Sequence, residues 1–265
     1  MFSLLASIRN NAALIWRLSK RDIESRYRGT FLGILWAIFI PVLLLLVYTF
    51  VFSVVFKARW GEDNTGQGSF ALILFCGLIF FNLFAECINR APTLILSNAI
   101  YVKKILFPLE ILPIVTIISA LFNFILSYLV LMVGYLFIEG IPSFEVLLVP
   151  LLLIPFCLLT LGLTYFLASL GVFVRDLGQI VGVFVMILMF LSPIFYPLAA
   201  IPEKYQAIIN LSPVTIIIEA ARGLMFRAAI PNLPLLGGYL IVSIIVLYLG
   251  FLWFKKTEKG FADVI

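Results

Sequence analysis

The sequence contains no histidine among its 265 residues. Histidine is the commonest general acid and base, the partner of serine nucleophiles and the zinc ligand of HExxH motifs, so sites of these three kinds are excluded. The sequence also has no Gly-Lys dipeptide and therefore no P-loop for binding phosphates. We expect no catalytic residues in this chain, and no ATP hydrolysis by that route.

Charged residues are scarce as well. Asp, Glu, Lys and Arg make up 12% of the chain, whereas 64% is hydrophobic and the mean hydropathy is +1.20. This composition predicts an integral membrane protein, in which residues 1–265 form one membrane domain. Basic residues beside apolar spans explain the net charge of +5 better than a nucleic-acid partner does.

The cysteines and glycines in or beside the apolar runs give only weak indications of metal sites, disulfides or helix contacts. The chain has three cysteines, Cys76, Cys87 and Cys157, all in apolar runs. Their spacing predicts neither a metal site nor a disulfide framework, so we interpret them as apolar filler. The pairs Gly29/Gly33 and Gly178/Gly182 have the GxxxG spacing that permits close helix approach.

Long apolar runs predict an all-α fold with six membrane-spanning helices, because about 20 apolar residues cross a ~30 Å hydrocarbon core. The expected spans are residues 31–56, 70–89, 111–138, 146–174, 177–197 and 235–254. Residues 198–234 are too broken for a span, and we interpret them as a re-entrant pair of short outer helices. The alternative is two helices that lie on the lipid surface.

Residues 1–28 predict an amphipathic helix at the membrane surface. The apolar face holds Ala12, Ile15, Ser19 and Ile23, and the opposite face holds Arg17, Arg21, Glu24 and Arg28. Either solvent or a partner protein explains the charged face.

The distribution of basic residues predicts the orientation. Five of the 18 Lys and Arg residues fall on one side of six alternating spans: Lys57, Arg59, Lys204, Arg222 and Arg227. All the others fall on the side that holds both termini. The positive-inside rule therefore places both termini in the cytoplasm.

Residues 97–113 form a basic island on the same side, and a helix is expected between Pro92 and Phe107. Lys103 and Lys104 are too costly to bury in a bilayer, and Pro92 and Pro108 are typical helix boundaries. We expect about four helical turns here, on the membrane face, as a docking surface for a cytosolic partner. The alternative is that Lys103 and Lys104 only fix the orientation of the chain in the membrane.

Aromatic residues recur on several spans and predict a conduit along which a sugar chain slides. The candidates are Tyr48, Phe52, Phe56, Phe81, Phe84, Tyr128, Tyr135, Phe195 and Tyr196. Contact with lipid is the alternative for each ring.

On the second span, Asn82, Glu86 and Asn89 share one helical face, which faces either a protein interior or the aqueous end of the span.

Several segments resemble one family. They are YRGTFLGILWAIFIPVLLLLVYTFVFSVVF from Tyr27, SNAIYVKKILFPLEILP, VFVRDLGQIV, SPIFYP, INLSPVTIIIEAARGLMF and FADVI. Together they resemble the permeases of type-2 ABC polysaccharide exporters, which move O-antigen, capsule and teichoic-acid chains. Ser212 departs from the asparagine expected before the proline.

The resemblance implies a homodimer in the inner membrane, bound to two ATPase subunits that hold ATP and Mg²⁺, with no cofactor in this chain. It implies a polysaccharide linked to undecaprenyl diphosphate. The residues expected to contact the ATPase are Arg17, Arg21, Ser97, Asn98, Tyr101, Lys103 and Lys104. We also expect Arg26 and Arg28 to attract the lipid diphosphate where it enters.

Export of O-antigen is the favoured function, with capsule or teichoic-acid export as the alternative. A transporter or channel that needs no ATPase is a second class of function. A membrane enzyme is a third, disfavoured because the chain lacks histidine and paired acidic motifs such as DxD.

Overall fold

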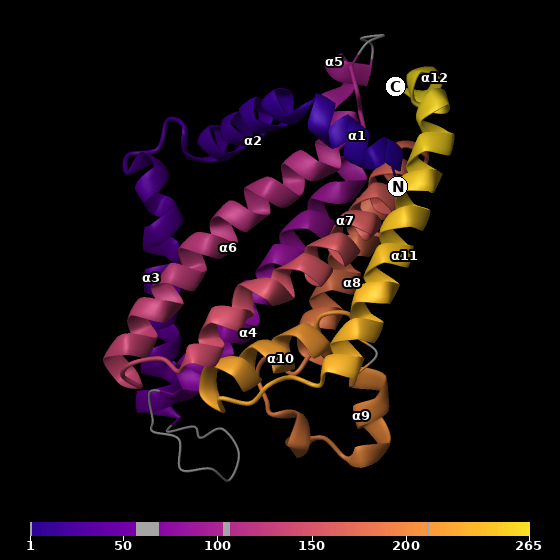
Figure 1. Cartoon of the computed structure of the whole chain (residues 1–265). Helices are drawn as coiled ribbons and strands as arrows, with labels where there is room; N and C mark the ends of the chain where they lie inside the picture. The colour runs from indigo at the N-terminus through magenta and orange to yellow at the C-terminus, as the bar shows by residue number, and fades with distance from the viewer. Residues whose placement is uncertain (1, 57–68, 103–106, 211) are drawn as a thin grey trace.

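The fold is all-α, as the computed structural model of residues 2–56, 69–102, 107–210 and 212–265 shows (Figure 1). No strand occurs in these ranges. Five helical segments are long and apolar enough to cross a membrane: Gly33–Val55, Ser69–Thr93, Ile111–Ile138, Phe144–Phe173 and Leu233–Val264. They correspond to five of the six predicted spans.

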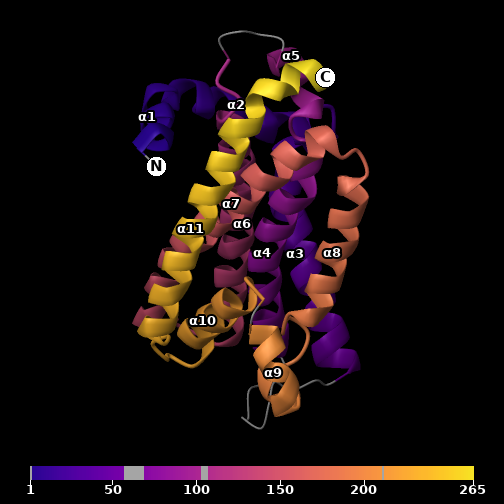
Figure 2. The same ribbon diagram turned by 90° about the vertical axis from the view of Figure 1, so that its right-hand side faces the viewer.

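The helices gather into one bundle whose two ends differ (Figures 1 and 2). The α-helices are α1 (Phe2–Asn10), α2 (Ala12–Tyr27), α3 (Trp36–Tyr48), α4 (Ser69–Arg90), α5 (Ala99–Val102), α6 (Ile111–Ile138), α7 (Val149–Phe173), α8 (Leu177–Leu191), α9 (Glu203–Asn210), α10 (Thr215–Phe226), α11 (Leu233–Thr257) and α12 (Phe261–Val264). Short 3₁₀ segments are η1 (Gly33–Leu35), η3 (Ala91–Thr93), η4 (Leu96–Asn98), η5 (Phe144–Leu148), η6 (Leu198–Ala200) and η7 (Glu258–Gly260), and the π-helix η2 (Thr49–Val55) continues α3. α1, α2, α5 and α12 lie at one end, which therefore holds both termini, whereas α9 and α10 lie at the other.

The predicted fifth span is shorter than expected. α8 has 15 residues and ends at Leu191, not at residue 197. Ser192 is extended (φ −78°, ψ 144°) because the following Pro193 disfavours the helical conformation. At 1.5 Å per residue α8 is about 22 Å long, less than the ~30 Å of a hydrocarbon core.

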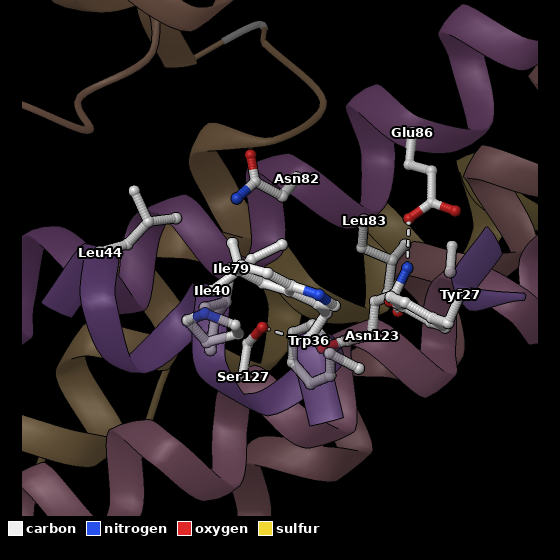
Figure 3. Close-up of a pocket in the computed structure, with 14 residues that line it drawn as sticks. Tyr27, Trp36, Ile40, Leu44, Ile79, Asn82, Leu83, Glu86, Asn123 and Ser127 are labelled. Atoms are coloured by element: carbon white, nitrogen blue, oxygen red, sulfur yellow. Dashed lines mark hydrogen bonds between the residues drawn. The ribbon is translucent and has the colours of Figure 1, made fainter. Parts of the chain in front are cut away.

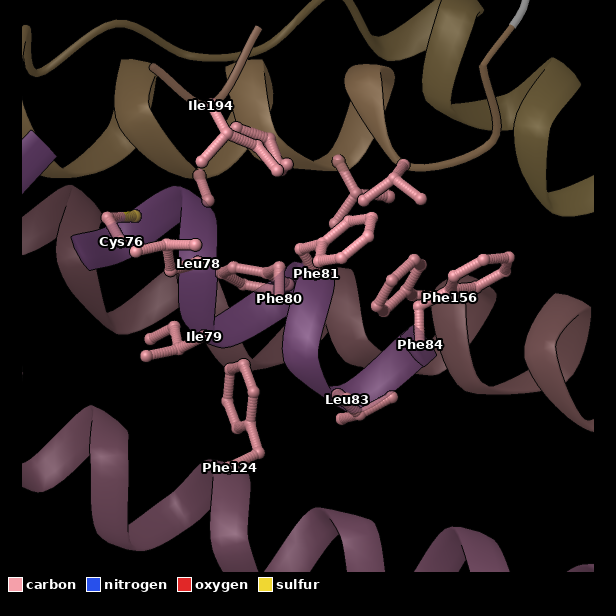
Figure 4. Close-up of a cluster of buried hydrophobic side chains, with 14 of the residues drawn as sticks. Cys76, Leu78, Ile79, Phe80, Phe81, Leu83, Phe84, Phe124, Phe156 and Ile194 are labelled. Atoms are coloured by element: carbon pink, nitrogen blue, oxygen red, sulfur yellow. The ribbon is translucent and has the colours of Figure 1, made fainter. Parts of the chain in front are cut away.

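α4 forms the centre of the bundle. In its most apolar window 83% of the residues are buried, against 17% in the window that contains α3. Rings from three helices interlock there: Phe80 meets Phe124 of α6 at a centroid distance of 4.9 Å, and Phe84 stacks on Phe156 of α7 at 6.3 Å (Figure 4). α4 is therefore the core helix, and α3 lies at the periphery.

Glycine lets α7 and α11 approach until their backbones touch. A Cβ built on Gly162 would lie 2.6 Å from the backbone of Leu247, and one on Gly250 would overlap the Gly162 carbonyl oxygen. A Cβ on Gly171 would likewise overlap the backbone of Pro92 in η3. These three sites lack GxxxG spacing.

The GxxxG spacing of Gly29 and Gly33 does not correspond to a helix contact within this chain. Both residues have positive φ, +83° and +53°, and a Cβ at either would meet nothing within 4 Å. They turn the chain from α2 into η1, where the left-handed conformation favours glycine. A Cβ at Gly182 also meets nothing, so the second pair makes no backbone contact there.

Candidate functional site

The N-terminal segment is two helices rather than the single helix expected over residues 1–28. α1 and α2 meet at Asn11, whose side chain donates to the Ser7 carbonyl oxygen at 2.9 Å. On α2, Ile15, Leu18 and Ser19 are buried, whereas Ala12 of the expected apolar face is exposed. The four residues of the predicted charged face, including Arg17, are exposed on the chain.

Four charged residues, here called the α2 ion cluster, join α2 to α4. Arg90 donates to both oxygens of Asp22, at 2.8 and 3.0 Å, and Arg26 pairs with Asp22 at 3.2 Å and with Glu86. Asn123 of α6 donates to Glu86 at 3.0 Å (Figure 3). The cluster has two positive and two negative charges, so it neutralises itself.

The electrostatics of the α2 ion cluster favour the charged forms. Burial alone would raise the pKa of Asp22, but the hydrogen bonds and positive charge of Arg90, with Arg26, lower it below its ordinary value. Burial alone would lower the pKa of Arg26, but Glu86 and Asp22 raise it. Asp22 and Arg26 are therefore charged at neutral pH, and their pairs with Arg90 and Glu86 fasten α2 to the bundle.

We expect Asp22→Asn to lower the stability of the protein by about 2 kcal/mol, since it removes the acceptor of a bidentate charged hydrogen bond from Arg90. Thermal unfolding in detergent measures this as a lower Tm. Glu24→Gln on the same helix is the control, because Glu24 is exposed and pairs with Lys20 at only 3.8 Å. Equal Tm changes in the two variants would contradict this role of the cluster.

The segment after α4 differs from the four-turn helix predicted over residues 92–107. The described part consists of η3, η4 and the single turn α5, and Lys103 and Lys104 lie outside the described residues. Tyr101 stacks on Phe107 with a centroid distance of 4.2 Å and accepts a hydrogen bond from Arg21 of α2 at 2.6 Å. The structure thus brings Arg21 and Tyr101 together at the end that holds both termini.

The other expected coupling residues lie near this contact. Ser97 and Asn98 bond to the Leu94 carbonyl oxygen, at 3.1 and 2.9 Å, and Ser97 remains exposed. Proline and polar side chains that bond to their own backbone favour turns over a long helix, which explains the broken segment. The coupling roles of Arg17, Arg21, Ser97, Asn98 and Tyr101 stay predictions.

Glu110 forms a second polar junction at this end. Its carboxylate accepts from Ser7 of α1 at 2.9 Å and from Lys255 of α11 at 3.2 Å, and its carbonyl accepts from Tyr165 of α7 at 2.7 Å. Burial alone would raise the pKa of Glu110, but its own backbone N–H, Ser7 and Lys255 lower it. Glu110 thereby connects α1, α7 and α11 to the start of α6.

The predicted conduit aromatics divide into two groups. Phe81, Phe84 and Tyr135 are buried, with exposed fractions of 3%, 2% and 8%. Helices of the same chain cover them, so the structure does not place these three on a surface that a conduit shares. The other candidates keep partial or full exposure, and their role stays a prediction: Tyr48, Phe52, Phe56, Tyr128, Phe195 and Tyr196.

The two arginines expected to meet a lipid diphosphate have different surroundings. Arg26 is held by Asp22 and Glu86, whereas Arg28 is exposed just after α2. Arg28 and Arg21 line a cavity of about 370 Å³. Arg28 is thus the better placed of the pair for an anionic group, and its role stays a prediction.

At the opposite end, Arg222 of α10 is buried to 3% exposure. It donates to the carbonyl oxygens of Ile73 at 3.1 Å, Ile194 at 2.9 Å and Pro193, and it pairs with Glu219 at 3.0 Å. It therefore joins α10 to α4 and to the segment after α8. The two helices expected in residues 198–234 are present as α9 and α10.

A comparison with protein families identifies the chain. A family model described as ABC-2 type transporter matches residues 13–226, which is most of the chain. The chain belongs to the ABC-2 type transporter family. The family resemblance drawn from the sequence motifs is thereby confirmed.

Curated relatives match this ABC-2 transporter chain over nearly its whole length. The O-antigen export system permease protein RfbA of Myxococcus xanthus is 28% identical over 268 residues, which is 100% of both chains. RfbA of Klebsiella pneumoniae is 27% identical over 94% of this chain and 93% of its own. The polysialic acid transport protein KpsM of Escherichia coli is 24% identical over 91% and 92%.

Sequence reasoning missed several residues that hold this ABC-2 transporter together. Asp22, Arg90 and Glu110 had no expected role, and Arg222 was counted only as a charge outside the spans. Only Glu110 carried an available signal, since a charge isolated within an apolar run needs a partner. No group of His, Cys, Asp and Glu suited to a metal occurs in the part of the chain that the structure describes.

Proposed function

We propose that this chain is the membrane permease of an ATP-driven exporter of lipid-linked polysaccharide, with O-antigen as the favoured polymer. The observation that carries this is the ABC-2 family match, together with two O-antigen permeases that match over 93% or more of both chains. Capsule export is the second candidate, because KpsM also matches, at lower identity.

The assembly we propose is a homodimer in the inner membrane with two ATPase subunits, which supply ATP and Mg²⁺. The absence of a P-loop from the sequence supports an ATPase on a separate chain. In this assembly α8 serves as a short sixth span, α9 and α10 form the re-entrant outer pair, and both termini are cytoplasmic. The cargo is a polysaccharide on undecaprenyl diphosphate, met by Arg28, and no nucleic acid takes part.

Closure of the ATPase subunits on ATP would press on α2 and α5, which lie at the end that holds both termini. Arg21 and Tyr101 join these two elements. The α2 ion cluster would pass the movement to α4 and α6, because Asp22 and Arg26 bind to Arg90 and Glu86, and Glu86 binds Asn123. Polar contacts thus run from the proposed docking surface to the central helix.

We expect Lys103→Glu with Lys104→Glu to abolish surface polysaccharide in a deletion strain while the protein stays in the membrane. Two reversed charges would repel an acidic docking surface on the ATPase. Lys256→Glu with Lys259→Glu is the matched control, because both lysines are exposed and lie beside α12, at the end of the bundle that also holds α5. Normal polysaccharide in the first variant would refute the docking role.

The deletion strain also tests the function itself. The wild-type chain should restore surface polysaccharide only together with an ATPase that co-purifies with it. Transport by liposomes that hold this chain alone would instead favour a transporter or channel that needs no ATPase.

A further inference from the structure

The central helix α4 has one open side, and that side is polar. Of its residues only Asn82 and Asn89 are exposed, while Ala85, Glu86 and Arg90 are partly exposed. Asn82 lies eight residues, about 12 Å, from the end of α4 at Arg90, which places it at membrane depth. An unpaired amide in hydrocarbon costs several kcal/mol, so Asn82 needs water or a polar ligand.

Asn82 lines a cavity of about 220 Å³ between α3, α4 and α6 (Figure 3). Trp36 borders it from α3, Glu86 from α4, and Asn123 and Ser127 from α6. The rest of the lining is mostly apolar. At roughly 30 Å³ per water molecule the cavity has room for about seven waters, a volume comparable to one sugar ring.

Three polar groups on the lining are available to a ligand. The Asn82 amide and the Trp36 indole N–H make no hydrogen bond with any residue that the structure describes. Pro41, also on the lining, has no N–H to offer the carbonyl oxygen of Ala37 four residues earlier. By contrast, Asn123 and Glu86 already bond to each other, and Glu86 pairs with Arg26.

These groups fit a neutral polyol with an apolar face. A sugar ring stacks its C–H face on an indole, and its hydroxyls pair with an amide and a carbonyl oxygen. A phosphate would meet the Glu86 carboxylate, and a lipid tail would leave Asn82 unpaired. A cation would find only one carboxylate, which Arg26 already pairs.

We propose that this cavity is a saccharide subsite that holds one sugar ring of the exported chain, with Trp36 as its stacking face and Asn82 as its hydrogen-bonding group. The proposal rests on the proposed function, since the sugar is part of the exporter's cargo. The cavity lies beside the α2 ion cluster, near the end from which the cargo would enter.

Cysteine protection tests the subsite without an export assay. Asn82→Cys and, as the matched control, Asn89→Cys are placed in a full-length chain whose Cys76, Cys87 and Cys157 are alanine, in nanodiscs. A soluble maleimide labels them with or without oligosaccharides released by mild acid from the source cells' own surface polysaccharide. At five times its Kd, the oligosaccharide should slow labelling of Asn82→Cys about sixfold, following 1 + [L]/Kd. Asn89→Cys, which lies outside the cavity lining, should keep its rate.

Equal labelling rates with and without oligosaccharide would overturn the subsite. So would a disulfide formed between two copies through Asn82→Cys, because a second copy would then cover this face.

In the deletion strain, Asn82→Leu should lower export about tenfold, the effect of one lost hydrogen bond, and Asn89→Leu should not. If the wild-type chain restores export while Asn82→Cys stays unprotected, only the subsite fails. If the wild-type chain restores no export, the proposed function as an exporter subunit is refuted.

Discussion

Gly250→Val is expected to separate α11 from α7 and to leave little folded protein in the membrane. A Cβ at this position would overlap the carbonyl oxygen of Gly162, which belongs to the backbone of α7 and cannot rotate away. Overpacked cores lose 1–3 kcal/mol where side chains yield, so we expect a loss of at least about 3 kcal/mol here. Thermal unfolding of the detergent-solubilised protein, with its yield in the membrane fraction, measures the effect.

Gly238→Val on the same helix is the control, because a Cβ at Gly238 meets nothing within 4 Å. It places the same β-branched side chain in α11 and should change the Tm by little. Gly162→Val tests the contact from the other helix and should resemble Gly250→Val. A stable Gly250→Val protein would show that α7 and α11 do not pack backbone to backbone.

Arg222→Met is expected to give the second large loss, about 3–5 kcal/mol, as for one partner removed from a buried ion pair. Methionine fills similar space but leaves Glu219 and the carbonyl oxygens of Ile73 and Ile194 without their donor. The Tm should fall. Cysteines placed on α10 should also become reactive, because α10 loses its attachment to α4.

Arg222→Lys distinguishes charge from geometry. Lysine keeps the positive charge but cannot reproduce the guanidinium fork, so most of the loss should remain. Arg227→Met, at the exposed end of the same helix, is the control and should stay within about 0.5 kcal/mol of wild type. Full stability of Arg222→Lys would assign the effect to charge alone.

The sequence predicted the long helices well because composition alone determines them. The span expected at residues 111–138 is the helix Ile111–Ile138, and three others differ by at most four residues at either end. The last span, expected at residues 235–254, lies within the longer helical segment Leu233–Val264. The prediction failed where a local break mattered. Pro193 ends α8 early, and the turns after Pro92 replace a continuous helix.

Long-range contacts could not be predicted from one sequence. GxxxG spacing pointed to Gly29/Gly33, whereas the backbones meet at Gly162 and Gly250, whose partners lie far along the chain. In the candidate site, the charged face of α2 was expected. Its attachment through Asp22 to Arg90 was not, because no pattern places residues 68 positions apart side by side.

The polar side of α4 was predicted in part. Asn82, Glu86 and Asn89 were expected on one helical face, and the structure places Asn82 and Asn89 on the exposed side of α4. The sequence left open whether that side meets protein or water. The cavity beside Asn82 was beyond prediction, since α3 and α6 supply most of its other walls.

The contact between Gly171 and Pro92 has a mechanical consequence for the proposed exporter. At Gly171 no side chain separates α7 from the backbone of Pro92 in η3, so the two backbones leave no compressible layer at this point. A displacement of α5 would therefore be transmitted directly to α7, and α7 would be the fixed helix about which other helices rotate. Few residues of α3 are buried, so α3 would be the helix that moves. The distance that α3 travels relative to α7 would then set the size of the conformational change.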